Sequence, residues 1–305
     1  MKHINRSITG SATSRAGSRY WRSKTPYLGV LPFLLFSGVF LIFPTISVIS
    51  GAFRDTNNRF TTDVLEQTLK SDLTHGAFMN SLEISVKTSI VGSILGGLFA
   101  WALVTGKKNG FFYRISVALS SVLAQFGGVM LTFAFLATFG FNGVVSTLAI
   151  KYSPDSFLAE SAWLYEINGL MVLYTFFQIP LMVLVFLPTL ENLRPHWREA
   201  SDSLGGNTSE YWFRVGIPVL TPSFFGATLL LFVNSFSAYA TAATLINLSS
   251  FITPLQIASA LSGDLGTANP AEAKSLALLM VVVVTVAMSL YALLRRKVSK
   301  WEQTR

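Results

Sequence analysis

Six apolar stretches, each about as long as a bilayer is thick, constrain this chain more than any other feature of its sequence. They cover roughly residues 28–50, 85–105, 115–138, 167–190, 223–245 and 273–294. A helix needs about 20 mostly apolar residues to cross a membrane. These stretches are too long for strands and lack period-two alternation, and a helix satisfies its own backbone hydrogen bonds in lipid. The sequence therefore predicts an all-α membrane protein with six transmembrane helices.

Composition supports this reading and excludes some kinds of chemistry. Only 12% of the 305 residues are charged, whereas soluble domains carry about 25%. The chain contains no cysteine. Disulfides, thiol nucleophiles and cysteine-ligated zinc are therefore excluded.

The basic residues predict the orientation of the spans. Seventeen of the 23 lysine and arginine residues lie in 1–27, 106–114, 191–222 and 295–305. Segments rich in lysine and arginine stay on the cytoplasmic side of a membrane. Both termini are therefore expected to be cytoplasmic. The net charge of +8 is explained by topology, so we expect no nucleic-acid partner.

The sequence offers no energy source of its own. The cores of the predicted spans carry no charged residue, and the three histidines, His3, His75 and His196, fall outside them. Proton-coupled carriers usually need a carboxylate or histidine inside the membrane, whereas sodium coupling through backbone carbonyls stays open. The chain also lacks the G-x-x-x-x-G-K-[ST] loop of ATPases. We predict no catalytic residue, no metal ligand and no cofactor, and a partner that supplies the energy.

The polar loop 191–222, between the fourth and fifth spans, is predicted to hold a short helix outside the lipid. Pro195 suits the first turn of a helix, and Gly205 suits its left-handed cap. Within the helix, Trp197, Ala200, Ser201 and Leu204 share one face. A rigid helix with small residues lets a partner pack closely. An ordinary interfacial helix would show the same pattern.

The loop also resembles a known motif. Glu199-Ala200-Ser201, then Gly205, then Ile217-Pro218 are similar to the EAA motif of the permeases of binding-protein-dependent ABC importers. The family form is E-A-A, three residues, G, about nine residues and I-x-L-P, so Ser201 replaces the third alanine. This small change leaves close packing in place.

The resemblance implies a type I ABC importer permease fold in the inner (plasma) membrane, as a multi-pass subunit that is not itself an enzyme. In that family the short helix docks on a separate ATPase subunit. Arg198 and Glu199 would then pair with partner charges, Ala200 and Ser201 would allow close packing, and Gly205 would turn the chain. The implied partners are ABC ATPase subunits, a second permease and an extracytoplasmic solute-binding protein.

The resemblance extends over a permease core, 80–294, which includes Asn80-Ser81-Leu82 and Ser235 to Tyr239. The remaining chain divides into a cytoplasmic tail at 1–27, a first span with its outer loop at 28–79, and a C-terminal tail at 295–305. The basic N-terminal tail could also meet anionic membrane lipid.

Few polar residues lie in the predicted spans, and these are the candidates for a solute path. They are Gln125, Gln178, Asn234, Ser237 and Tyr239. In the resembled family the path runs between two permeases near the fifth span. Hydrogen bonding between helices explains the same residues equally well. The sequence of the fifth span is similar to that of permeases for polyamines, ferric iron and phosphonates. The acidic outer loops fit either a cationic solute or a basic docking surface on the binding protein.

The predicted function is therefore the permease subunit of an ATP-driven importer, coupled through residues 197–222. A secondary transporter or channel is the alternative, and it should show intramembrane charge or a broken-helix ion site. A membrane enzyme would need clustered catalytic groups. A neighbouring reading frame for an ATPase would separate the first hypothesis from the others.

Overall fold

The protein is nearly all helical. The computed structural model describes residues 25–54, 59–106, 110–246, 252–263 and 268–303. Among the residues that the structure describes, the only β-type pairing is an isolated antiparallel bridge between Arg54 and Phe60. Most of the predicted basic tail, as well as Lys107 and Lys108, lies outside the described residues. The helical class predicted from the apolar stretches is confirmed.

Six segments of the described chain are long and apolar enough to cross a membrane. They are Val30–Gly51, Asp72–Thr105, Gly128–Tyr152, Ile167–Glu191, Thr208–Phe236 and Pro270–Leu294. The number agrees with the sequence prediction. The third segment begins later than expected, because the predicted stretch 115–138 is divided between two helices.

Contacts divide the chain into two compact units, Met1–Ser47 and Val48–Arg305. The first unit holds α1 (Thr25–Ser37), the π-turn Gly38–Ile42 and the start of α2 (Phe43–Gly51). In the π-turn, the amide of Phe43 donates to the carbonyl of Gly38, five residues back. Proline lacks an N–H and its ring crowds the carbonyl four residues earlier. The wider turn just before Pro44 relieves that crowding and keeps the first span helical.

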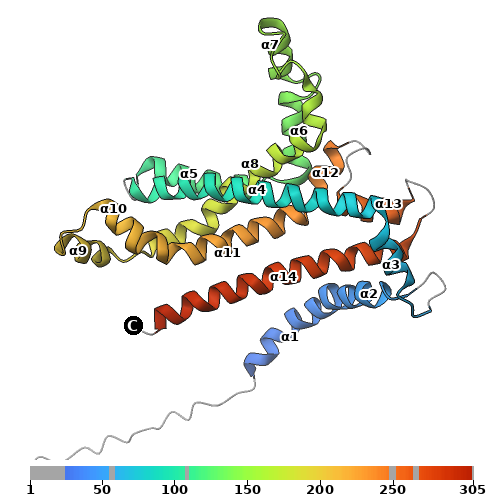
Figure 1. The fold of residues 1–305 in the computed structure, drawn as a ribbon, viewed down its shortest axis with the longest axis horizontal. Helices are drawn as coiled ribbons and strands as arrows, with labels where there is room; N and C mark the ends of the chain where they lie inside the picture. Colours follow the sequence, from blue (N-terminus) through green and yellow to red (C-terminus); the bar gives the residue numbers. More distant parts are fainter. Residues whose placement is uncertain (1–24, 55–58, 107–109, 247–251, 264–267, 304–305) are drawn as a thin grey trace, which may run out of the picture. The chain divides into compact units, whose positions relative to one another are not determined.

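The second unit is built around four long helices. These are α4 (Asp72–Thr105), α8 (Ile167–Glu191), α11 (Ile217–Phe236) and α14 (Pro270–Gln303). Helix α8 packs against α4, α11 and the shorter α5 (Phe111–Gln125), while α14 packs on α11 (Figure 1). Helix α8 therefore lies at the centre of the packing, and more than half of its apolar window is buried.

Close packing of α4 on α8 depends on glycines. A methyl group at Gly96 would lie 2.6 Å from the backbone oxygen of Ile179 and 2.6 Å from Cβ of Met182. At Gly92 it would lie 2.8 Å from Cβ of Gln178. Small residues let two helix backbones approach closely in a membrane. The G-x-x-x-G pair in α4 is thus an internal packing face.

We expect Gly96→Ala to destabilise the protein and Gly76→Ala to leave its stability unchanged or raise it. Both glycines lie in α4, but a methyl group at Gly76 meets nothing within 4 Å. Overpacking costs about 1–3 kcal/mol, whereas alanine favours an open helix by about 0.5–1 kcal/mol over glycine. Thermal unfolding in detergent, followed by circular dichroism, measures both. Equal melting temperatures for the two variants would contradict the packing argument.

Two predicted spans are wrong as continuous helices. The stretch 115–138 breaks between α5 and α6 (Gly128–Phe139), where Gly128 takes a left-handed φ of +64°. The stretch 223–245 breaks between α11 and α12 (Ala240–Leu245). Glycine provides the first break, since it tolerates positive φ. The second break contains neither glycine nor proline, so tertiary contacts must hold it.

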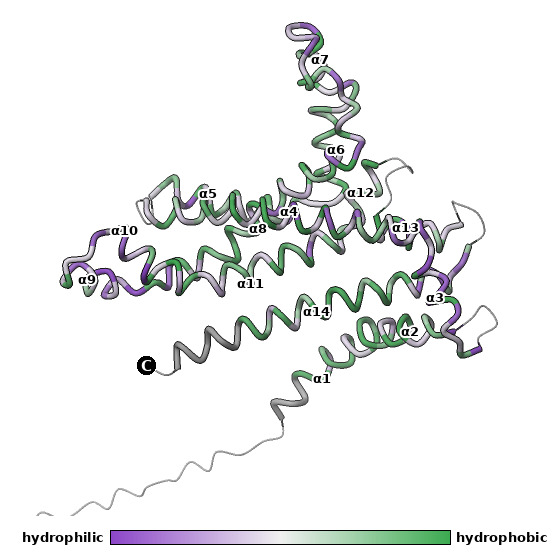
Figure 2. Tube along the Cα trace, viewed as in Figure 1, coloured by the Kyte–Doolittle hydropathy of each residue, from purple (hydrophilic) through white to green (hydrophobic). Residues whose placement is uncertain are grey.

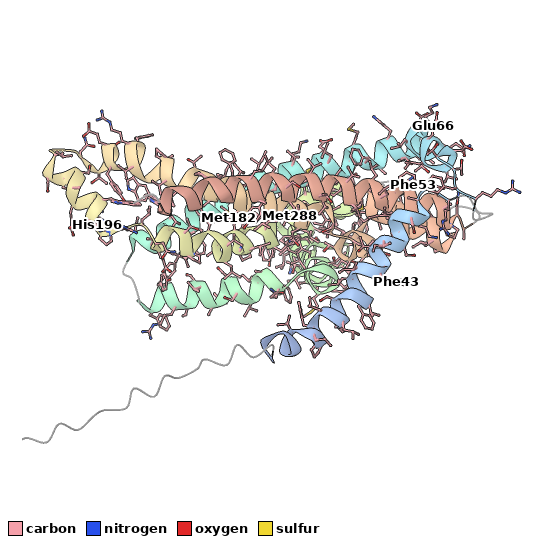
Figure 3. All side chains as sticks on the ribbon, turned by 90° about the horizontal axis from the view of Figure 1, so that it is seen from below. Phe43, Phe53, Glu66, Met182, His196 and Met288 are labelled. Carbon is pink, nitrogen blue, oxygen red and sulfur yellow. The ribbon has the colours of Figure 1, made fainter. Side chains whose placement is uncertain are left out.

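Polar segments collect at the two ends of the long helices of the second unit. One end holds α9 (Pro195–Ser203) and α10 (Thr208–Tyr211), and the other holds α3 (Asp63–Lys70) and α13 (Thr253–Ser262) (Figure 2). Figure 3 labels His196 at the first end, Glu66 at the second, and Met182 and Met288 between them. Helices that cross a membrane show this pattern, with an apolar middle and polar ends that meet water.

Candidate functional site

The first candidate site is the short helix α9. It begins at Pro195, in the first turn as predicted, and ends at Ser203. It contains no buried residue, so packing against its own chain does little to hold it. A nine-residue helix is marginal in water, and its ends must therefore fix it.

Gly205 provides that fixation. Its φ of +80° is left-handed, a conformation that glycine adopts without strain. The amide of Gly206 donates to the carbonyl of Ser201 at 2.9 Å, and the amide of Gly205 donates to Asp202 at 3.0 Å. These are the two bonds of a Schellman cap, which satisfies the last carbonyls of a helix. The predicted stop of the helix at Gly205 is confirmed.

The chain returns from α9 through a second cap. Asn207 and Glu210 form a capping box, in which the Glu210 amide donates to Asn207 Oδ1 at 2.8 Å and the Asn207 amide donates to Glu210 Oε2 at 3.1 Å. Helix α10 then runs through a π-turn, Trp212–Gly216, into α11, with Pro218 at its start. Local hydrogen bonds therefore order the connection from α9 to α10.

The predicted coupling residues lie together on or next to this helix, and most face outward. Arg198, Glu199 and Ala200 are exposed and Ser201 is half-buried. Ile217 and Pro218 are exposed at the start of α11. Leu204, at the tip, is 89% exposed, which is unusual for a leucine among polar residues. The arrangement presents a capped helix with charged side chains, a face of small residues and an exposed leucine at its tip.

The second candidate site is a cavity of about 260 Å³ where the two helix breaks meet. Four of the five predicted path residues line it: Gln125, Asn234, Ser237 and Tyr239. Gln125 ends α5, Asn234 lies in α11, and Ser237 and Tyr239 flank the second break. All four are exposed to the cavity or the surface and none is charged. Such a lining can hydrogen-bond a polar solute without selecting its charge.

The fifth candidate, Gln178, lies elsewhere. It is fully buried, and its Nε2 donates to Thr88 Oγ1 at 2.9 Å. Thr88 Oγ1 also lies 3.0 Å from Ser235 Oγ. These three side chains tie α8, α4 and α11 together. The structure thus places Gln178 in a junction between helices and not in the lining of the cavity.

A larger cavity, about 600 Å³, is lined mainly by aromatic residues, among them Phe135, Phe139 and Trp163. It includes none of the predicted path residues. Among the residues that the structure describes, no group of three or more His, Asp or Glu comes together to hold a metal.

Sequence reasoning missed the helix breaks and the side chains that support them. The Gly127-Gly128 pair was a usable signal for the first break, because paired glycines punctuate helices. Tyr174, which bonds to the segment of the second break, showed no comparable signal. Leu204 was placed on a helical face but not recognised as the exposed tip.

Comparison with curated proteins finds distant relatives of one kind. The chain is 22% identical to "Ferric transport system permease protein FbpB" of Actinobacillus pleuropneumoniae over 69% of its length and 30% of the relative. It is 26% identical to "Sulfate transport system permease protein CysT" of Escherichia coli over 46% of its length and 60% of the relative. A Mycoplasma genitalium homolog of the spermidine/putrescine permease PotC is 33% identical over 63 residues, 21% of the chain and 22% of that protein. The chain thus spans less than two thirds of the length of these relatives. No family model matches.

Solved structures of ABC transporters have a fold similar to that of this chain. A bacterial alginate ABC transporter, crystallised with a periplasmic protein bound to alginate pentasaccharide, has a TM-score of 0.66 at 15% identity over 88% of this chain and 92% of its own. The MetNI methionine ABC transporter has a TM-score of 0.55 at 14% identity over 74% of this chain and 95% of its own. The six apolar helices and these relatives indicate a multi-pass protein of the inner membrane. Sequence and fold together identify the chain as a relative of the permease proteins of ABC transport systems.

Proposed function

We propose that this chain is the membrane subunit of an ATP-driven importer and that α9 is its contact with a separate ATPase. The observation that carries the proposal is the capped helix α9, which presents Arg198, Glu199 and Ala200 to the outside. A helix that transmits force must not unravel when it is pushed. The Schellman cap at Gly205 and the capping box after it meet that requirement.

The motif residues divide the coupling task between them. Glu199 and Arg198 supply charges that a partner can pair, and charge complementarity fixes the register of two surfaces. Ala200 and Ser201 allow close approach. Ile217 and Pro218, at the start of α11, connect the loop to the helix that carries Asn234. Movement of α9 would therefore reach the cavity through α11.

The energy source and further partners follow from the same proposal. ATP would be hydrolysed on the partner chain, and an external solute-binding protein would deliver the solute. A second permease would complete the path. The ferric permease relative supports this pairing. The 213 aligned residues are only 30% of its length, so it is long enough to hold two units as long as this chain. Residues 80–294 would form the permease core.

The cavity at the helix breaks is the proposed place of solute passage. Polar side chains exposed on a membrane helix normally face water or protein, because lipid cannot hydrogen-bond them. The relatives are named for ferric ion, sulfate and spermidine/putrescine, whose charges differ in sign. An uncharged lining suits a path whose selectivity resides mainly in the binding protein. Uptake of labelled polyamine or ferric iron tests the cation preference inferred from the outer loops.

A single introduced thiol tests the contact with the ATPase directly, because the chain has no native cysteine. Leu204→Cys, at the tip of α9, is expected to form a crosslink to a P-loop ATPase in native membranes when a short bifunctional thiol-to-amine reagent is added. Leu69→Cys is the matched control, since Leu69 is an exposed leucine on α3 at the other end of the helices. Crosslinking of the ATPase at Leu69, or its absence at Leu204, would contradict the proposal.

A further inference from the structure

The break between α11 and α12 is not explained by local sequence. Residues 235–245 contain neither glycine nor proline and are rich in alanine, which favours an uninterrupted helix. Helical bonding nevertheless stops at Ser237 and resumes at Tyr239, whose carbonyl accepts the Ala243 amide at 2.9 Å. The amide of Ala238 donates three residues back, to Ser235, at 3.1 Å. Something outside the segment must therefore hold the break.

A hydroxyl from α8 lies at this point. Tyr174 Oη donates to the carbonyl of Ala238 at 2.6 Å. In an uninterrupted helix that carbonyl would accept the amide of Ala242, four residues on. The Tyr174 side chain is 1% exposed, and a buried hydroxyl without an acceptor is unfavourable. The Tyr174 hydroxyl and the Ala238 carbonyl thus satisfy each other only while the carbonyl points toward α8.

We propose that Tyr174 is a positioning residue that holds α11–α12 in its broken form, and that loss of its hydroxyl shifts this segment toward a continuous helix. The segment then has two discrete hydrogen-bonding arrangements that differ in the partner of one carbonyl. Elements with two such arrangements underlie many conformational switches.

The break shapes the polar cavity. Asn234 and Ser237 line it from one side of the break and Tyr239 lines it from the other. Straightening the segment would rotate Tyr239 relative to Asn234 and change the cavity. This consequence for transport rests on the proposed function. Whether the segment is broken or continuous does not depend on the proposed function, so it is measured separately from uptake.

The test uses spin labels on either side of the break. Phe225→Cys in α11 and Ala243→Cys in α12 place two labels at exposed positions of the full chain. Eighteen residues of continuous helix span about 27 Å, and a bent segment is shorter. Double electron–electron resonance in lipid nanodiscs is expected to show a shorter distance with Tyr174 and a population near about 27 Å with Tyr174→Phe. Hydrogen exchange at the Ala242 amide should slow in the same variant.

Two further variants complete the test. Tyr291→Phe changes a tyrosine of α14 that packs beside Gly226, and it should leave the distance unchanged. Thr132→Val removes the 3.4 Å bond from α6 to the Thr241 carbonyl and should leave the break in place. The proposal is overturned if the distance between the two labels is unchanged in Tyr174→Phe. It is also overturned if Thr132→Val, and not Tyr174→Phe, lengthens that distance. If the Tyr174→Phe chain cannot be purified in a folded state, Tyr174 supports the whole fold and not only the break, which also contradicts the proposal. If the distance responds but uptake does not, the break is held as proposed and the cavity is not the path.

Discussion

Replacing Gly205 by valine should reduce ATP-driven solute uptake about tenfold or more, with the chain still inserted in the membrane. The left-handed φ of +80° at this position strains a β-branched residue by about 1–3 kcal/mol. Helix α9 has no buried residue to compensate, so its last turn should unravel. Each 1.4 kcal/mol lost from docking weakens binding about tenfold. Uptake in membrane vesicles supplied with ATP measures the effect.

Two controls distinguish the cap from general damage to the loop. Gly205→Asn should retain most of the uptake, because asparagine tolerates the left-handed conformation. Ser209→Val changes an exposed residue of α10 and should have little effect. If valine at position 205 matched the wild type, the rigid helix would not be the coupling element.

Replacing Asn234 and Gln125 together by leucine should reduce uptake about 5-fold or more while the ATPase remains bound. Both side chains line the polar cavity, and a site that hydrogen-bonds its ligand loses affinity when those groups are removed. A pair of hydrogen bonds contributes about 1–3 kcal/mol in total, which corresponds to roughly 5- to 150-fold in binding. Leucine also favours helix continuation at both positions.

This variant and the Gly205 variant should fail in different ways. The cavity variant should co-purify with the ATPase and lose solute uptake, whereas the α9 variant should lose both. Gln67→Leu, at an exposed position of α3, is the matched control. Normal uptake by the double-leucine chain would place the path outside this cavity.

The parts of the fold that sequence predicted well are those set by local pattern. The fourth span was predicted at 167–190 and α8 runs from Ile167 to Glu191, because this stretch is long, mostly apolar and free of charge until its last residue. The start and end of α9 could be predicted equally well, since Pro195 acts through its fixed φ and Gly205 through its tolerance of positive φ.

The parts that sequence did not reveal depend on contacts between distant residues. The bend after Phe236 is associated with a bond from Tyr174, 64 positions from Ala238 in the chain, and no local feature marks it. The same limit applies to the path residues. Polarity alone selected Gln178 and Asn234 alike, yet Gln178 is buried against Thr88 and Asn234 lines a cavity. Only the packing of α4, α8 and α11 separates them.

If this chain is the membrane subunit of an ATP-driven importer, as proposed, it should stay bound to its ATPase. Gentle purification of the tagged full chain from its native membranes, followed by identification of every bound chain and a vanadate-sensitive ATPase assay, tests it most directly. The expected result is a complex that contains a P-loop ATPase and hydrolyses ATP, and both are lost when Gly205 is replaced by valine. A chain that purifies alone and moves solute on an ion gradient in liposomes would contradict it and favour a secondary transporter or channel.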